Sequence, residues 1–197
     1  MTKTKVSYVG TRTTTFSGVA YWEMVQLFGG PAECDSEVVS VKANEEVLPI
    51  VIGHGGRGGI AMETGAEGRV EGPVNCFLKL LGSYQTTMDC PLQVFGAIKK
   101  QLNFALMACP GVRIQDIDAI LGHAKSKGAC EKFIRDLGVR FIEVANNGQG
   151  AIDIASRPEF AKAAALGLIT VAEECGLEVL KKACEDQPAA TTFFFLG

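Results

Sequence analysis

Short apolar runs alternate with polar, glycine-rich loops along most of the chain. Val6–Val9 is such a run, and it leads through the Gly/Thr/Ser-rich residues 10–17 into a helical pattern over 18–28. Ile60–Met62, a loop of small residues and a helical pattern over 74–81 repeat this layout. Successive strand–loop–helix units predict an open α/β sheet, with ligands at the carboxyl ends of the strands.

The remaining runs predict the other strands and the helices that cover them. Strands are expected over 38–41, 47–52, 92–98, 102–107, 119–121, 139–144, 166–170 and 191–196. Short helical segments are expected over 114–117, 129–137, 151–156, 159–165 and 171–175. The glycine-dense residues 53–59 form a flexible loop in this interpretation, which either wraps a ligand or closes a mobile hairpin.

The chain ends in the β-branched and aromatic residues Thr191–Leu196, after Pro188. This composition is typical of a strand, and so apolar an end needs a place in a sheet because it would otherwise fray or aggregate. In one interpretation the strand carries Thr191 and Thr192 to the edge of a site. In the other it is a plain closing strand, and the threonines only suit the pleat.

Composition narrows the class of protein. The 197 residues are 47% hydrophobic and 21% charged with a net charge of −3, which is ordinary for a soluble protein of one large domain or two small lobes. No basic stripe is available for nucleic acid, and no run reaches the roughly 18 apolar residues of a membrane span. The N-terminus lacks a long apolar signal core, so we expect a cytoplasmic protein.

The residues of metal and cofactor sites are sparse. The seven cysteines are scattered without a CxxC pair, and His54 and His123 are the two histidines. Neither a disulfide framework nor a zinc site is indicated. A dinucleotide fingerprint is also absent from the sequence, so we expect no metal, flavin or nicotinamide cofactor.

Four polar loops lead into helices, near residues 11, 64, 123 and 147. Hydroxyls and backbone N–H groups at a helix start favour an anion, and the first loop adds Arg12 but lacks the lysine and glycine spacing of a phosphate loop. A small carboxylate therefore fits better than a nucleotide, although helix capping by Thr15 or Ser17 explains the same residues. His123 either assists anion binding or is a structural histidine. Four such loops facing one another would line a cleft between two lobes.

The order of five motifs resembles the prephenate dehydratase family over Val6–Leu196. The first four resemble its G-x-x-G-T-F-S, I-E-N-S-x-E-G, S-H-P-Q-A-L-x-Q-C-x-x-F and A-A-I-A…Y-G-L-x-V-L segments, and the tail resembles N-x-T-R-F. The matching residues of this chain, in the same order, are Tyr8–Gly10 with Thr15–Ser17, Met62–Gly68, Gly122–His123 with Cys130 and Phe133, Ala164–Ala165 with Gly176–Leu180, and the last strand.

The resemblance implies a two-lobed α/β fold like that of periplasmic binding proteins (type II), with the active site in the cleft between the lobes. The lobes are expected to be residues 1–84 plus 167–197, and residues 85–166. A regulatory ACT domain, which senses amino acids in many family members, is not expected in this chain, and neither is feedback by phenylalanine. The family also implies a homodimer.

The departures from the family motifs concern its active site. In this alignment, the family Thr-Arg-Phe falls on Thr192-Phe193-Phe194, so phenylalanine replaces the arginine. The family Asn-Ser falls on Thr64-Gly65, and a family histidine on Asn103. The resemblance makes Thr192, Glu63 and Asn103 the catalytic candidates. Substrate-binding candidates are Arg12, Thr13, Thr14, Thr15, Thr64, Gly65, His123, Lys125, Asn147, Gln149, Phe193 and Phe194.

The change from arginine to phenylalanine matters for a dicarboxylate substrate such as prephenate, because an apolar ring replaces a positively charged guanidinium with fixed hydrogen-bond donors. We therefore expect a prephenate decarboxylase that releases CO2 without aromatisation and forms a dihydro-4-hydroxyphenylpyruvate for natural-product biosynthesis, as some family members do. The alternatives are a prephenate dehydratase that forms phenylpyruvate, and a non-catalytic protein that binds small anions.

Overall fold

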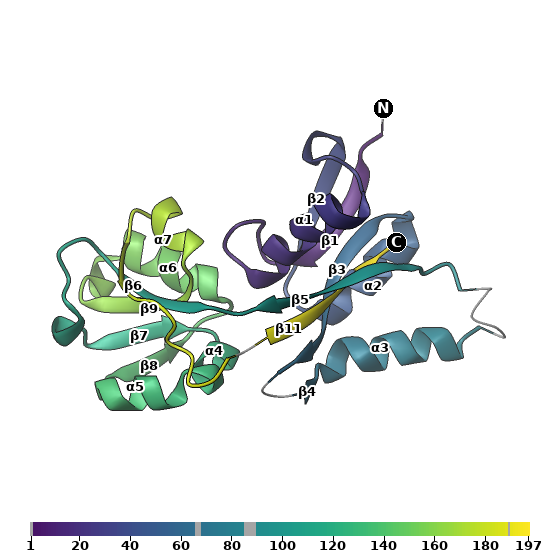
Figure 1. Cartoon of the computed structure of the whole chain (residues 1–197). Helices are drawn as coiled ribbons and strands as arrows, with labels where there is room; N and C mark the ends of the chain where they lie inside the picture. The colour runs from purple at the N-terminus through teal and green to yellow at the C-terminus, as the bar shows by residue number, and fades with distance from the viewer. Residues whose placement is uncertain (1, 66–67, 85–89, 189) are drawn as a thin grey trace. The chain divides into compact units, whose positions relative to one another are not determined.

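The computed structural model describes residues 2–65, 68–84, 90–188 and 190–197, and it has the expected α/β fold (Figure 1). The chain forms two compact units. The first comprises residues 1–12, 16–100 and 190–197, and the second comprises 13–15 and 101–189. Compared with the expected lobes, residues 85–100 group with the first unit and residues 167–189 with the second.

The sheet of the first unit has the strand order β2-β1-β3-β11-β5, and β4 pairs with β3. Strands β2, β1 and β3 are parallel, whereas β11 runs antiparallel to β3. The C-terminal strand, yellow in Figure 1, thus lies between β3 and β5. The strands are β1 (Thr4–Val9), β2 (Ser36–Val41), β3 (Arg57–Thr64), β4 (Gly68–Arg69), β5 (Val94–Gln101) and β11 (Ala190–Leu196).

Two hydrophobic clusters pack on this sheet. One, the α1-side core, joins Phe193 and Phe195 to residues of β1 and of α1 (Phe16–Phe28). The other joins Leu196 and the partly buried Phe194 to α2 (Val47–His54), and Phe77 of α3 (Glu71–Gly82) packs against it. Alternate residues of a strand face opposite sides of its sheet, so β11 contributes to both cores. This confirms that the C-terminal residues form a strand within a sheet.

The prediction for residues 47–59 is wrong. Residues 47–52 lie in helix α2 instead of a strand, and left-handed Gly55 ends that helix. From Arg57 onward the expected loop is strand β3. Gly58 lets α2 approach the sheet, because a Cβ atom there would lie 2.6 Å from side-chain atoms of Val47 and Val51.

The sheet of the second unit has the order β10-β6-β9-β7-β8. Its central strand β9 (Ala163–Leu168) is buried along its whole length. The helix predicted over 159–165 is therefore wrong, because this stretch is a short 3-10 turn, η5 (Pro158–Phe160), followed by the start of β9. Strand β7 is parallel to β8 and β9, as expected. The other strands are β6 (Phe104–Ala108), β7 (Ala119–Gly122), β8 (Arg140–Glu143) and β10 (Glu178–Lys181).

The helices of the second unit are α4 (Ala124–Ala129), α5 (Glu131–Leu137), α6 (Asn147–Ser156) and α7 (Thr170–Glu174). Further short 3-10 turns among the described residues are η1 (Glu33–Asp35), η2 (Asn44–Glu46) and η4 (Ile114–Asp116). Across the described ranges, no helix is long and apolar enough to cross a membrane.

Cys184, buried in the second unit, makes stability depend on alkaline pH. Burial raises the pKa of its thiol from 9.0 to about 11. The unfolded chain therefore loses the thiol proton first, so the stabilisation is complete below pH 9 and is lost as pH rises through 11. We expect the free energy of unfolding to fall by about 2 kcal/mol from this group between about pH 8 and about pH 10.5. Urea unfolding of Cys184→Ala should show a correspondingly smaller fall, and an equal fall in both proteins would contradict the assignment.

Candidate active site

The first polar loop joins the second unit at helix α6. A Cβ atom at Gly148 would lie 2.5 Å from Thr14 Oγ1, so the absence of a side chain there allows the close approach of Thr14. Thr13 Oγ1 donates a hydrogen bond to Glu174 at 2.9 Å, and its carbonyl accepts one from Thr170 Oγ1. Thr15 is buried. The loop expected near residue 11 is thus held against the start of α6.

His123 is tied to the same helix start. Asn147 Oδ1 accepts a hydrogen bond from the His123 backbone N–H at 3.0 Å. The His123 ring caps α4, because its Nδ1 accepts from the backbone N–H of Lys125 at 3.2 Å. An accepting Nδ1 carries no proton, so in this arrangement the neutral imidazole has its proton on Nε2. Residues 13–15 of the first loop therefore group with the loops near residues 123 and 147 in the second unit, whereas the sequence analysis placed the first loop in the other lobe.

The amide of Gln149 is already engaged. Its Nε2 donates to Asp153 at 2.9 Å, and its backbone N–H donates to Asn146, the N-cap residue of α6. The other backbone N–H groups in the first turn of α6 have no acceptor within the helix, and together with the helix dipole they favour an anion. The second unit therefore offers neutral hydrogen-bond donors, and Lys125, a sequence-predicted cation of this unit, is exposed.

The fourth loop belongs to the first unit, at the ends of β3 and β11. Thr191 pairs with Thr64 in the strand register, so their side chains project from the same face of the sheet about 5 Å apart. Both hydroxyl oxygens are buried and have no hydrogen-bond partner in the described part of the chain. Thr191 is 3% exposed. A buried hydroxyl without a partner is costly, and two opposite each other mark a place for a polar ligand group.

The neighbouring register pair is Thr192 with Glu63, and it lies on the opposite face. Thr192 is partly buried and Glu63 is exposed. The Gly65 backbone N–H closes this end by donating to the Ala190 carbonyl at 2.6 Å. The next two residues of the expected motif, Ala66 and Glu67, lie outside the described residues.

Phe193 and Phe194 differ in their surroundings. Phe193 is 2% exposed and packs in the α1-side core with Tyr8, Tyr21 and Trp22. It is therefore a core residue in the first unit, whereas the partly buried Phe194 packs on the opposite face.

The remaining two candidates are exposed. Arg12 forms an ion pair with Glu33, and its guanidinium lies 5.0 Å from the centre of the Trp22 ring. The Trp22 indole N–H donates a hydrogen bond to the Tyr8 hydroxyl at 3.2 Å. Burial raises the pKa of Tyr8, and this hydrogen bond and the charge of Arg12 partly oppose that rise. Asn103 directly precedes β6.

No three His, Cys, Asp or Glu side chains gather as a metal site would require in the residues that the structure describes.

Sequence reasoning left Thr191 out of its site candidates, although it placed this residue at the edge of a site. The missed signal was the period of two in the strand, which puts Thr191 on the same face as the core residues Phe193 and Phe195.

A sequence model of the prephenate dehydratase family matches residues 6–197. The chain belongs to the prephenate dehydratase family. Prephenate dehydratases from Arthrobacter aurescens, in complex with L-Phe, and from Staphylococcus aureus share its fold, with TM-scores of 0.74 and 0.69 and sequence identities of 21% and 20%. Each superposition covers 98% of this chain, and 60% and 66% of the respective structures.

Curated plant relatives are similar over a shorter stretch. Arogenate dehydratase/prephenate dehydratase 6 of Arabidopsis thaliana and arogenate dehydratase 1 of Petunia hybrida are each 24% identical over 115 residues. This stretch is 58% of this chain, 28% of the Arabidopsis protein and 27% of the Petunia protein. The chain thus aligns with less than a third of the length of these relatives.

Proposed function

We propose that the protein is a lyase that converts prephenate to phenylpyruvate, CO2 and water. The observation that carries this proposal is the pair of buried, unpartnered hydroxyls of Thr64 and Thr191 at the strand ends of the first unit, as far as the described residues go. The reaction needs a hydrogen-bond donor for a departing hydroxyl group, and a preorganised hydroxyl meets that need. The dehydratase names of the relatives support the same reaction.

The reaction balances without an oxidant or reductant. The bond between the ring and its carboxylate breaks, CO2 leaves, and the electron pair enters the ring. The carbon–oxygen bond on the opposite side of the ring breaks, and the departing hydroxide takes up one proton to become water. The ring becomes aromatic, while the 2-oxo acid side chain is retained. The protein must therefore orient two carboxylates and assist one leaving hydroxyl.

In this proposal Thr191 assists the leaving hydroxyl. The alignment that gave Thr192 this role put the family arginine on Phe193, which is a core residue. Moving the family Thr-Arg-Phe one residue earlier, onto Thr191-Thr192-Phe193, places its phenylalanine in the core and its catalytic threonine on the unpartnered hydroxyl. The arginine then corresponds to Thr192. Glu63 and Asn103 remain catalytic candidates in this proposal.

In the second unit, Thr14, the start of α6 and His123 form a separate group of hydrogen-bond donors, and we propose that this group binds a carboxylate. Replacing His123 with asparagine should keep the α4 cap, because an Asn side-chain oxygen can accept the hydrogen bond that Nδ1 accepts now. It removes the Nε2 donor. We expect thermal stability close to that of the wild type and a KM for prephenate raised about 10-fold, since one hydrogen bond to a charged group is lost.

His123→Ala is the matched variant, because it removes both the cap and the donor. It should show the same rise in KM and, in addition, a loss of about 1 kcal/mol in the free energy of unfolding. Steady-state kinetics and urea unfolding check both variants. An asparagine variant with an unchanged KM would remove His123 from the binding site.

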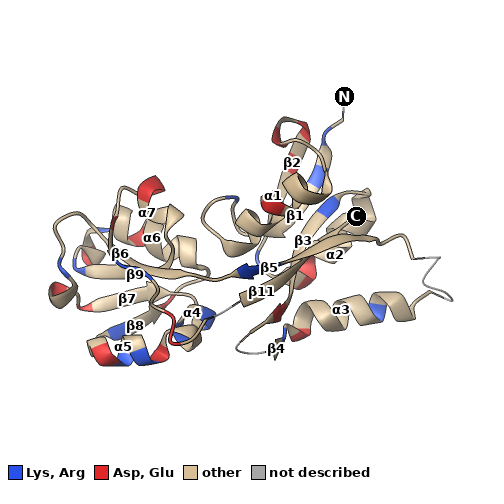
Figure 2. Ribbon diagram, in the orientation of Figure 1, with Lys and Arg blue, Asp and Glu red and all other residues tan. Residues whose placement is uncertain are grey.

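A prephenate decarboxylase that retains the ring hydroxyl is the second candidate. The observation in its favour is that β11 has no arginine and, as Figure 2 shows, no charged residue at all. Incubation of the purified protein with prephenate, followed by chromatography and mass spectrometry, separates the two reactions. Phenylpyruvate supports the dehydratase, and a dihydro-4-hydroxyphenylpyruvate supports the decarboxylase. Thermal stabilisation by prephenate without turnover would indicate an anion-binding protein.

A further inference from the structure

Glu63 has a register partner on each side. Strand β3 lies between β4 and β11, with Arg69 of β4 directly opposite Glu63 and Thr192 of β11 directly opposite it on the other side. Directly opposite residues of an antiparallel pair project from the same face of the sheet. Arg69, Glu63 and Thr192 therefore form one row across three strands, with about 10 Å between the Cβ atoms of its outer members.

The packing of the neighbouring residues identifies the face. Val70, next to Arg69, packs into the α1-side core, and so do Phe193 and Phe195. Arg69 and Thr192 each precede one of these core residues, so they point to the other face, which α2 and α3 cover. Arg69 thus stands on the same face as the position that corresponds to the family arginine.

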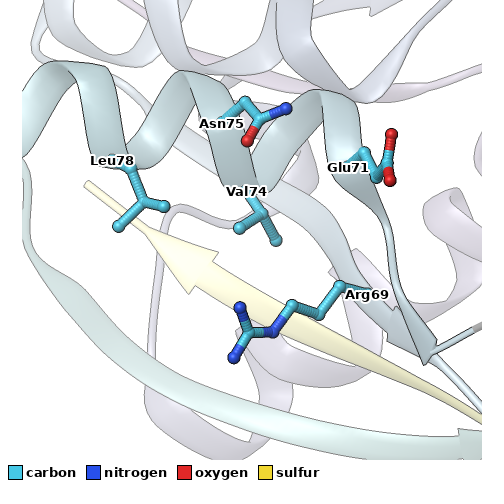
Figure 3. A pocket seen from close by; sticks show the side chains of 5 residues that line it. All are labelled: Arg69, Glu71, Val74, Asn75 and Leu78. Atoms are coloured by element: carbon cyan, nitrogen blue, oxygen red, sulfur yellow. The ribbon is translucent and has the colours of Figure 1, made fainter.

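Arg69 is also available to a ligand. It is exposed, and no carboxylate of the described residues lies within ion-pair distance of it, Glu63 included. It borders a hollow of about 500 Å³, whose other lining residues are Glu71, Val74, Asn75 and Leu78 of α3. Figure 3 shows the guanidinium beneath the side chains of Val74 and Leu78. Leu78 is 58% exposed, so the hollow presents an apolar wall next to a cation.

We propose that Arg69 binds the carboxylate of the substrate's 2-oxo acid side chain, and that it supplies from β4 the guanidinium that the last strand lacks. This inference rests on the proposed function. The hollow suits a carboxylate on a short side chain, because a guanidinium pairs with a carboxylate in two parallel hydrogen bonds while Val74 and Leu78 lie beside that side chain.

Two considerations select the side-chain carboxylate. The ring carboxylate must lose its charge as CO2 leaves, and a guanidinium paired with it would stabilise the ground state against that step. The side-chain carboxylate keeps its charge throughout, so pairing with Arg69 lowers KM without opposing the reaction. The product phenylpyruvate retains this carboxylate and should therefore bind to Arg69 as well.

The experiment compares Arg69→Gln and Arg69→Lys with Lys79→Gln, which removes a charge from the last turn of the neighbouring helix α3. For Arg69→Gln we expect a KM for prephenate about 10- to 100-fold higher, with kcat within about threefold of the wild type. Inhibition by phenylpyruvate should weaken by the same factor. Inhibition by phenylacetone, which lacks the carboxylate, should not change. Arg69→Lys should recover part of the loss, and Lys79→Gln should behave like the wild type.

A double variant moves the guanidinium along the row. Arg69→Ser combined with Thr192→Arg places the guanidinium on the other side of Glu63. Arg69→Ser alone should raise KM, and the double variant should bring KM most of the way back to the wild-type value. If Arg69 only balanced the charge of Glu63, then Arg69→Gln combined with Glu63→Gln would restore KM instead, and this result would overturn the proposal.

The two proposals fail separately. A wild-type protein that turns over prephenate, with Arg69→Gln indistinguishable from Lys79→Gln, would overturn the role of Arg69 and leave the proposed function standing. A wild-type protein without turnover that binds phenylpyruvate only when Arg69 is present would overturn the proposed function and leave the carboxylate site standing.

Discussion

Thr191→Val is expected to lower kcat for prephenate about 100- to 10,000-fold while raising the stability of the protein. The catalytic loss follows from removing a positioned donor at the leaving oxygen. The gain in stability follows because the Thr191 hydroxyl is buried without a described partner, and valine fills the same space without an unsatisfied oxygen. A gain of about 1 kcal/mol in the free energy of unfolding is expected. Activity assays and urea unfolding of the same preparation measure both effects.

Two comparison variants make this prediction specific. Thr191→Ser keeps the hydroxyl and should keep most of the activity. Thr192→Val changes the neighbouring threonine, which is partly buried on the other face, and should lose clearly less activity than Thr191→Val. A larger loss in Thr192→Val would return the catalytic role to Thr192.

Phe193→Arg is expected to cost about 4 kcal/mol or more in the free energy of unfolding, or to prevent folding. A guanidinium at this position would enter the core formed by Tyr8, Tyr21 and Trp22 without a paired carboxylate, and an unpaired buried charge is among the most destabilising changes. Chemical denaturation and near-UV circular dichroism measure the effect. Phe193→Leu is the control for lost ring packing and should cost about 1–2 kcal/mol.

The same variant also tests the alignment. If Phe193 stood in the active site, arginine there would be tolerated and would promote the formation of phenylpyruvate. A folded Phe193→Arg protein with increased formation of phenylpyruvate would therefore contradict both the core position of Phe193 and the choice of Thr191.

The sequence predicted most of the architecture because most elements carry a clear local signal. The β-branched and aromatic tail is strand β11, and the buried run 119–121 lies in the parallel strand β7. The run 47–52 failed because six residues of continuous apolar character have no period, and Val-Leu-Pro-Ile-Val-Ile suits a buried helix and a buried strand equally. Only the packing of Val47, Leu48 and Val51 against the sheet distinguishes the two.

The site is harder to predict from the sequence than the fold, because the assignment of its residues depends on the register of the strands. A shift of one residue in a strand exchanges its two faces, so the two placements of the family motif assign the catalytic role to Thr191 or to Thr192 on opposite faces of the sheet. Cross-strand neighbours are also invisible to local patterns. Arg69 and Thr192 are more than a hundred residues apart in sequence, and only the pairing of both with Glu63 connects them.

The bulge in β3 has a consequence for how this site tolerates change in length. Thr192 pairs with Glu63 and Phe193 with Ala61, so Met62 is a supernumerary residue of the ladder. Deleting Met62 would remove the bulge and make Ala61 and Glu63 neighbours, so Ala61 would still lie opposite Phe193 and Glu63 would still lie opposite Thr192. A one-residue deletion elsewhere in β3 would instead exchange the faces of the residues on one side of the deletion, so Met62 should be the position of this strand at which a deletion is best tolerated.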